Sequence, residues 1–259
     1  MILSFPYHDP EGRYNHAFQR HLQTLQSAFD AVCVSVASPT RKGNAGFVRY
    51  LEAQGCGVFD NPAGATIGGQ SREALRLALT HAQVGQPIFF GFLDRILFAL
   101  ETEWRWQFLQ DLTVYRTAEF LVFERSQAAW DTHPANYREI EQMISRVFEL
   151  FSGRSIELMP CALLLSCDAA SSILSQSSSP SCEVWAEWTL LAMKNGIPVT
   201  TRKVDWLAWE HPHWQGVDPA ELKRCREASP DEVVKRIKMN APVALMLAEE
   251  RFRRLGASL

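Results

Sequence analysis

Three side chains are suited to phosphate and hydroxyl chemistry, and each lies next to a distinctive local sequence. Asp94 follows the apolar run of residues 87–92, Arg72 follows a glycine-rich turn, and Glu187 lies between Trp185 and Trp188. A carboxylate can bind a hard cation or take a proton from a hydroxyl, and a guanidinium can neutralise a phosphate. This combination suits a site that handles a phosphorylated ligand and a hydroxyl group.

Each of these side chains also has a plain structural interpretation. Asp94 can cap the helix that follows it, and Arg72 can be a solvated residue of a first helical turn. Arg95 can bind a phosphate in the place of a metal ion, or it can pair with an acidic side chain on the surface. Glu187 can be an exposed helix acid, although flanking indoles would raise its pKa and suit it to act as a base. Glu183 is a neighbour that could exchange roles with it.

A second group of candidates lies between residues 206 and 214, in a proline-containing loop. Trp209 could present an indole face to a sugar ring, and His211 and His213 form a weak metal-binding pair. The alternative is a loop that buries its own aromatic side chains. Near the N-terminus, His8 and Asp9 follow the first apolar run and could touch a nucleotide, or they could be ordinary turn residues.

The elements that must position these residues alternate along the first hundred residues. Short apolar runs at 2–5, 31–36, 58–59 and 87–92 predict strands, and apolar spacing of three and four predicts helices at 16–29, 47–54 and 71–82. This rhythm predicts an α/β fold, with a mostly parallel central sheet flanked by helices. Ligands of such sheets bind at the carboxyl ends of the strands.

The second half is less regular. We expect helices at 95–109, 136–151, 166–174 and 183–194, and strands at 120–123 and 199–204. Ser166 should cap the third of these helices, and Ser229 should cap a terminal helix that Pro242 breaks or kinks. In the 136–151 helix an unbroken apolar stripe should face the core, formed by Ile140, Met143, Ile144, Val147, Phe148 and Phe151. The serine-rich stretch 175–181 should form a loop, and within it residues 176–181 have no apolar anchor. We expect these residues to form a mobile lid that must close before Glu187 can act.

Composition excludes several classes of protein. The 259 residues are 47% hydrophobic and 21% charged, and the net charge of −3 argues against binding to nucleic acid or anionic membrane. No apolar run reaches the roughly 20 residues of a membrane span. Six scattered cysteines without a C-x-x-C pair indicate reduced thiols. We therefore expect a cytoplasmic protein with no disulfides and no zinc cluster.

Two stretches resemble the glycosyltransferase type A (GT-A) fold of nucleotide-diphosphosugar transferases. The first runs from Asn61-Pro62-Ala63-Gly64 through Gly68-Gly69-Gln70-Ser71-Arg72-Glu73-Ala74-Leu75 to the apolar segment ending in Asp94. The second comprises Ala186-Glu187-Trp188-Thr189-Leu190-Leu191-Ala192 and Asn195-Gly196-Ile197-Pro198-Val199. The first resembles the family's turn, helix and apolar strand that lead to its Asp-x-Asp signature. The second resembles the family's helix that begins with an acidic residue. The resemblance covers residues 2 to 205, in the expected order.

The resemblance implies a GT-A-like domain at residues 1–214 and a C-terminal helical extension, residues 215–259, packed on it. It implies transfer of a sugar from a nucleotide-diphosphosugar donor to a hydroxyl acceptor, with Glu187 and Asp94 as catalytic residues. The implied donor-binding residues are Phe5, Pro6, Tyr7, Ser38, Arg72, Arg95 and Trp209. A nucleotidyltransferase and a non-catalytic nucleotide- or sugar-binding protein are the alternatives.

One departure from the family concerns the metal. The family's Asp-x-Asp signature is represented here by Asp94-Arg95-Ile96, so the second carboxylate is absent. A divalent cation, Mn²⁺ or Mg²⁺, is consequently doubtful, and we expect nucleotide binding to depend less on metal than is usual for this fold.

Overall fold

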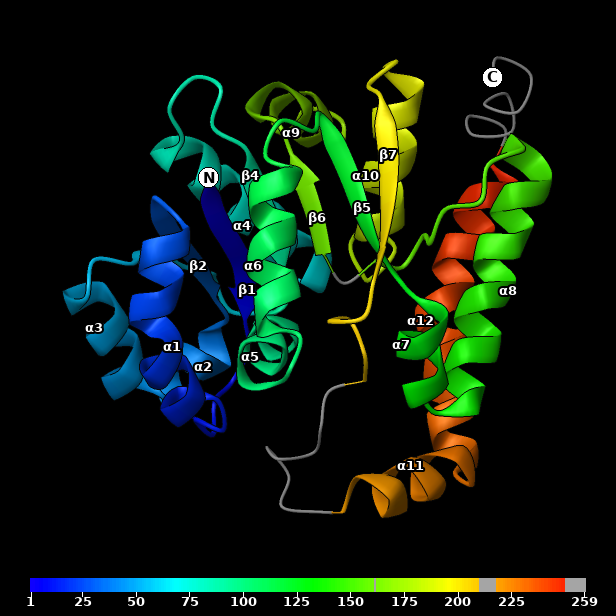
Figure 1. The fold of residues 1–259 in the computed structure, drawn as a ribbon, viewed down its shortest axis with the longest axis horizontal. Coiled ribbons are helices and arrows are strands. Elements are labelled where there is room, and N and C mark those ends of the chain that lie inside the picture. Colours follow the sequence, from blue (N-terminus) through cyan, green and yellow to red (C-terminus); the bar gives the residue numbers. More distant parts are fainter. Residues whose placement is uncertain (161, 210–217, 250–259) are drawn as a thin grey trace.

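A computed structural model describes residues 1–160, 162–209 and 218–249. Its centre is a seven-stranded sheet with the order β3-β2-β1-β4-β6-β5-β7 (Figure 1). The strands are β1 (Ile2–Tyr7), β2 (Ala31–Val36), β3 (Gly57–Asp60), β4 (Ile88–Gly91), β5 (Phe120–Arg125), β6 (Ala162–Leu165) and β7 (Val199–Val204). β6 runs antiparallel to both of its neighbours, whereas the other pairs are parallel. The prediction of a mostly parallel sheet is confirmed.

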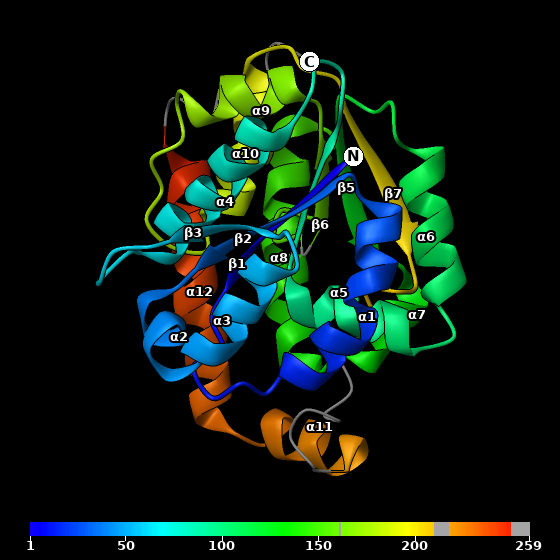
Figure 2. The same cartoon turned by 90° about the vertical axis from the view of Figure 1, so that its left-hand side faces the viewer.

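Helices cover both faces of this sheet (Figures 1 and 2). One core packs against the side chains of Ile2, Phe90 and Val122, and the other packs against those of Leu3, Phe5 and Phe89. The first core includes α4 (Ile67–His81), α8 (Ala135–Ser152), α9 (Cys167–Leu174), α10 (Val184–Lys194) and α12 (Pro230–Ala248). The second includes α1 (Asn15–Ala28), α3 (Ala45–Ala53), α5 (Leu93–Glu101) and α6 (Arg105–Val114).

Three short helices complete the described chain. They are α2 (Ser38–Gly43), α7 (Gln127–Thr132) and α11 (Pro219–Glu227). In the C-terminal part, α12 packs along α8 and also contacts α10, and α11 contacts α12 at the lower end of the fold (Figure 2).

Side-chain caps account for several helix starts. Ser166 Oγ accepts a hydrogen bond from Ala169 N at 3.1 Å, and Ser229 Oγ accepts one from Glu232 N at 3.4 Å. Both caps were predicted from the sequence. Helix α4, in contrast, begins at Ile67, because Thr66 caps it by accepting from Gly69 N at 3.1 Å. The glycines expected in a turn therefore belong to the first turn of this helix, and Arg72 lies in its second turn.

Two other expectations about the helices were wrong. The stretch 95–109 forms two helices, since the chain leaves the helical path between Glu101 and Arg105. In α8 the apolar stripe is only partly buried, and Met143 and Phe151 are 57% and 46% exposed. Of the break or kink expected at Pro242, the break is excluded, because helix α12 continues through this residue. Tertiary packing along α8 supports this helix despite the hydrogen bond that proline cannot donate.

No helix in the described ranges has both the length and the apolar character needed to cross a membrane. The described cysteines, Cys33, Cys56, Cys167, Cys182 and Cys225, are free thiols.

Candidate functional site

A cleft of about 320 Å³ opens at the carboxyl ends of β1 and β4. The segment after β1 contributes Pro6, Tyr7, His8 and Tyr14, and the segment after β4 contributes Phe92, Leu93 and Asp94. Ile67 and Gln70 of α4, together with Cys182, Trp185 and Met239, complete the wall. Three of the residues predicted to bind the donor or to act in catalysis, Pro6, Tyr7 and Asp94, are thus brought together.

The position of this cleft follows from the sheet topology. The chain passes from β1 outward to β2 and β3, and then returns to place β4 on the other side of β1. The connections that follow β1 and β4 consequently diverge, and a crevice remains between them. This reversal of strand order is where open α/β sheets bind their ligands.

A buried network of polar side chains fixes the loop after β1. The Asp9 carboxylate accepts hydrogen bonds from the backbone of Arg13 and Tyr14, each at 2.9 Å. The Tyr7 hydroxyl donates to Asp9 Oδ2 at 3.2 Å and accepts from Asn44 Nδ2 at 3.2 Å. Burial, followed by the neighbouring Asp9 charge, raises the pKa of Tyr7. Tyr7 is therefore a neutral structural residue at the wall of the cleft.

Two helices begin at the cleft. Ile67 is the first residue of α4, Leu93 is the first residue of α5, and both line the cleft. A helix N-terminus carries a partial positive charge, which favours an anionic ligand. Part of each helix start is already engaged, because Gly68 N and Gly69 N donate to Pro180 O and Thr66 Oγ1, and Arg95 N donates to Asp94 Oδ1. The two helix dipoles therefore offset the negative charge of Asp94 in the same wall.

Asp94 lies in the first turn of α5, three residues beyond the end of β4. Its Oδ1 accepts a hydrogen bond from Arg95 N at 2.9 Å. The Arg95 guanidinium is directed elsewhere, because Nη1 donates to the carbonyl of Ala208 at 3.0 Å. The structure therefore puts Asp94 in the wall of the cleft and Arg95 outside it.

Glu187 is fully buried and holds the serine-rich loop. Its carboxylate accepts hydrogen bonds from the hydroxyl of Ser177 at 2.6 Å and from the backbone N–H groups of Ser178 and Ser179 at 3.1–3.3 Å. Arg72 supports the same loop, since Nη1 donates to Ser179 O at 2.6 Å. Hydrogen bonds to Glu187 and Arg72 therefore hold this loop in place, although it has no apolar side chain to bury. Neither Glu187 nor Arg72 lines the cleft.

The other predicted site residues are dispersed. Phe5 is buried in the second core, where its ring meets that of Phe18 at 5.8 Å. Ser38 is the half-buried first residue of α2. Trp209 lines a different hollow of about 350 Å³, together with Phe98 and Trp104. His211 and His213 lie outside the described residues.

Trp185 and Met239 were missed as cleft residues. Trp185 is 8% exposed, its ring meets Phe92 edge-on at 4.7 Å, and its indole N–H finds no acceptor among the described residues. Met239 lies on α12, about 145 residues after Asp94 in the chain, and its side chain lines the cleft. The Trp185-x-Glu187-Trp188 spacing pointed to the correct helix, but no local signal connects α12 to the cleft.

The described lining offers few ligands for a divalent cation. It contains one carboxylate, Asp94, and one imidazole, His8. Nowhere in residues 1–160, 162–209 and 218–249 do three His, Cys, Asp or Glu side chains gather as metal ligands would. A cation at Asp94 would need most of its ligands from the bound molecule or from water, which is compatible with the way Mg²⁺ binds phosphates.

Comparison with solved structures identifies the fold. A crystal structure of glucosyl-3-phosphoglycerate synthase from Mycobacterium tuberculosis superposes with a TM-score of 0.52 at 11% identity, over 95% of this chain and 79% of that chain. The same enzyme with Mn²⁺, UDP-glucose and phosphoglyceric acid, and with phosphoglyceric acid alone, also gives 0.52 at 11% identity. Those alignments cover 92% of this chain and 79% and 80% of the neighbours.

Sequence comparison alone finds no such likeness. No family model matches the chain, and no curated protein matches it. The superposition on the synthase nevertheless extends over 95% of the chain. The chain therefore has the glycosyltransferase type A fold, the fold of nucleotide-diphosphosugar transferases.

Proposed function

We propose that this protein transfers a sugar from a nucleotide-diphosphosugar donor, which binds in the cleft between the ends of β1 and β4. One observation carries the proposal: the cleft lies at the reversal of strand order, with the Asp94 carboxylate in its wall and two helix N-termini at its edge. The structural neighbour with UDP-glucose bound supports this choice of ligand.

The diphosphate would lie against the starts of α4 and α5. A helix N-terminus stabilises an anion by about 0.3–1 kcal/mol at an exposed site and by up to about 2 kcal/mol when partly buried. Stabilising the leaving diphosphate is the largest electrostatic task of a glycosyl transfer. The cleft performs it in part through backbone dipoles, which need no side-chain movement.

The sugar of the donor would be held near Trp185. The buried indole N–H has no acceptor among the described residues, and a buried donor of this kind is costly unless a ligand or water completes it. A sugar hydroxyl is a suitable acceptor, and the edge of Phe92 offers an apolar contact beside it. Trp185 would then orient the sugar relative to the diphosphate.

A divalent cation would be held by Asp94 together with the phosphate oxygens of the donor. It would add positive charge next to the departing diphosphate. Asp94 would also help to position the donor without a cation, since a carboxylate can accept hydrogen bonds from the ribose hydroxyls. The base that takes the acceptor proton is proposed to be Glu187, provided that the 177–179 loop releases its carboxylate.

The test measures the release of nucleotide from UDP-glucose and from GDP-mannose by the full chain, with Mn²⁺ or with chelator. The same assay is run on the Asp94→Asn variant. Asp168→Asn is a matched control, because Asp168 is an exposed aspartate in the first turn of α9. We expect turnover that Asp94→Asn lowers at least tenfold and Asp168→Asn leaves unchanged. Donor binding without turnover would indicate the non-catalytic binding protein, and absence of binding would end the proposal.

A further inference from the structure

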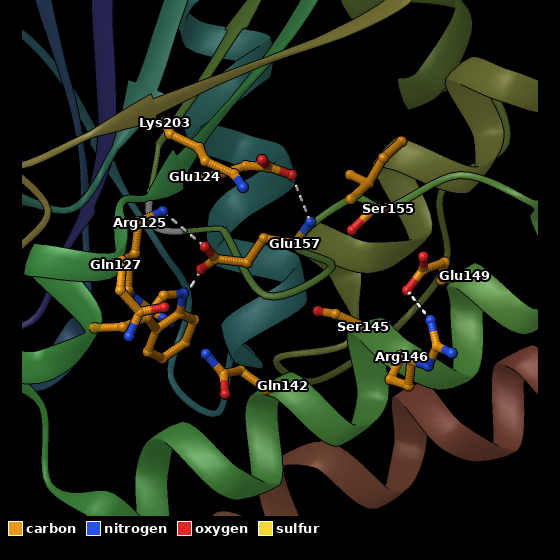
Figure 3. A pocket seen from close by; sticks show the side chains of 12 residues that line it. Glu124, Arg125, Gln127, Gln142, Ser145, Arg146, Glu149, Ser155, Glu157 and Lys203 are labelled. Atoms are coloured by element: carbon orange, nitrogen blue, oxygen red, sulfur yellow. Dashed lines mark hydrogen bonds and ion pairs between the residues drawn. The ribbon is translucent and has the colours of Figure 1, made fainter.

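A further hollow, of about 400 Å³, lies on the other side of β6 from the cleft and shares no lining residue with it. It is bounded by the ends of β5 and β7, by α7 and α8, and by residues 155–157 (Figure 3). We call it the β5–α8 groove. In Figure 3, Gln142 rises from α8 toward Glu157, and Ser145 and Ser155 stand at one side of the opening.

Buried charges hold the wall of this groove in place. Arg125, 5% exposed, ion-pairs with Glu141 at 2.6 Å and with Glu157 at 3.0 Å. The Glu157 backbone N–H in turn donates to Glu124 Oε1 at 2.8 Å, and Glu157 Oε2 accepts from Arg125 N at 2.8 Å. These contacts join β5, α8 and the loop after α8. The groove is therefore a rigid feature and not a gap between loose elements.

The charges that line the groove are balanced. Glu124, Glu149 and Glu157 face Arg125, Arg146 and Lys203. Arg146 pairs with Glu149 at 2.6 Å, and the Lys203 charge lowers the pKa of Glu124, which burial raises. Because the pKa of Glu157 is raised to about 7, two to three negative charges face three positive charges near neutral pH, and the groove has little net field that would favour an anion or a cation. A neutral ligand with many hydroxyl groups fits such a lining.

Several polar groups of the groove have unused hydrogen-bonding capacity. Within the described residues, the exposed side chains of Gln142 and Ser155 make no hydrogen bond, whereas the buried Glu157 Oε1 is engaged in the 3.0 Å ion pair with Arg125 Nη1. Burial, partly offset by Arg125, raises the pKa of Glu157 to about 7. Amide, hydroxyl and carboxyl groups together can both donate to and accept from adjacent sugar hydroxyls.

We propose that the β5–α8 groove is a second binding site, which takes a neutral saccharide independently of the donor cleft. Gln142 and Ser155 contact the saccharide hydroxyls directly, while the buried ion pair of Arg125 and Glu157 fixes the wall behind them. Ile156 and Trp130 supply apolar surface in the same lining. A protein that transfers sugars would use such a site to retain an oligosaccharide outside the reaction centre.

The experiment measures binding of maltotriose and cellotriose to the full chain by saturation-transfer NMR and calorimetry. Gln142→Ala removes the amide from an exposed position of α8, and Gln19→Ala, at an exposed position of α1, is the matched control. We expect saturable binding of at least one trisaccharide, weakened about tenfold or more by Gln142→Ala and unaffected by Gln19→Ala. Affinity should be nearly the same at low and high salt, because the ligand is neutral.

Three results would overturn the proposal: no binding of either trisaccharide at millimolar concentration, equal binding by Gln142→Ala, or displacement of the trisaccharide by UDP. Displacement by UDP would put the saccharide in the donor cleft. A Ser155→Tyr variant, which fills the exposed side of the groove, checks the site again without altering α8, and it should also abolish binding. Since no turnover is measured, the outcome is independent of the proposed transferase activity.

Discussion

The hydroxyl of Ser177 donates to the carboxylate of Glu187 at 2.6 Å, and the indole N–H of Trp188 donates to that same hydroxyl at 3.0 Å. Ser177 thus lies between two residues of α10, and the serine-rich loop is joined to the helix that follows it. The contact gives Glu187 an anchoring function beside the catalytic function expected from the sequence. The two functions make different predictions.

Glu187→Gln should lower the free energy of unfolding by about 1–3 kcal/mol, because an amide nitrogen would face the N–H groups of Ser178 and Ser179. Proteolysis within residues 176–181 should accelerate. Denaturant unfolding and limited proteolysis measure both effects, with Glu139→Gln on the exposed face of α8 as control. A variant that loses turnover with unchanged stability would instead support a purely catalytic Glu187.

Gly68→Ala should displace the 176–181 loop, because Gly68 of α4 contacts this loop directly. A Cβ at residue 68 would lie 2.0 Å from the carbonyl oxygen of Ser179, and the Gly68 N–H already donates to Pro180 O at 2.9 Å. We expect loss of stability and weaker donor binding in the variant. Gly46→Ala is the control, because a Cβ there meets no atom within 4 Å in α3. Equal behaviour of the two variants would mean that the loop adapts freely.

Nucleotide affinity should depend weakly on divalent metal. The described cleft lining contributes a single carboxylate, Asp94, whereas metal sites of this kind normally combine carboxylates with phosphate oxygens. Calorimetric titration with UDP should show less than about a tenfold loss of affinity when Mn²⁺ is replaced by chelator, which corresponds to less than about 1.4 kcal/mol. Complete loss of binding in chelator would refute this expectation.

Stability should fall as the pH rises through neutrality because of Glu157. Its pKa is about 7 in the folded protein, above the ordinary value of 4.5, so folding favours the protonated carboxyl. The stabilisation is complete below about pH 4.5 and is lost as the pH rises through 7, with an upper bound of about 3 kcal/mol. His133 acts in the opposite direction at lower pH, since burial lowers its pKa.

The Glu157→Gln variant isolates this contribution. Its amide oxygen can still accept from Arg125 N, but the side chain does not titrate. The difference in unfolding free energy between wild type and variant should therefore change between pH 5 and pH 8, while the His133 contribution cancels. A difference that stays constant over this range would show that Glu157 is charged throughout.

The two faces of α8 should respond differently to truncation. Ile144 is 2% exposed in the first core, so Ile144→Ala should cost about 2–5 kcal/mol. Met143, adjacent in sequence, is 57% exposed, and Met143→Ala should cost less than about 0.5 kcal/mol. Chemical denaturation of the two variants tests the burial pattern, and equal costs would contradict it.

The sequence by itself determined the order of most elements and the place of Asp94, but strand β6 and the short helices α2, α7 and α11 were not predicted. Apolar runs and helical spacing are local patterns, and the strands and helices that they predict follow from propensity and from the need to bury one face. The position of Asp94 at the end of β4, the caps at Ser166 and Ser229, and the alternation that puts ligands at the strand ends were all readable from neighbouring residues.

Only the tertiary structure decided which side chains meet at the cleft. Phe5 and Pro6 are adjacent, yet one faces the second core and the other faces the cleft, and the choice depends on how both faces of β1 are packed. Met239 reaches the cleft because α12 packs on α8, and Glu187 points into the loop because the N–H groups of that loop require an acceptor. These contacts join residues far apart in the chain, or satisfy groups that only the folded backbone brings near, so no local spacing could specify them.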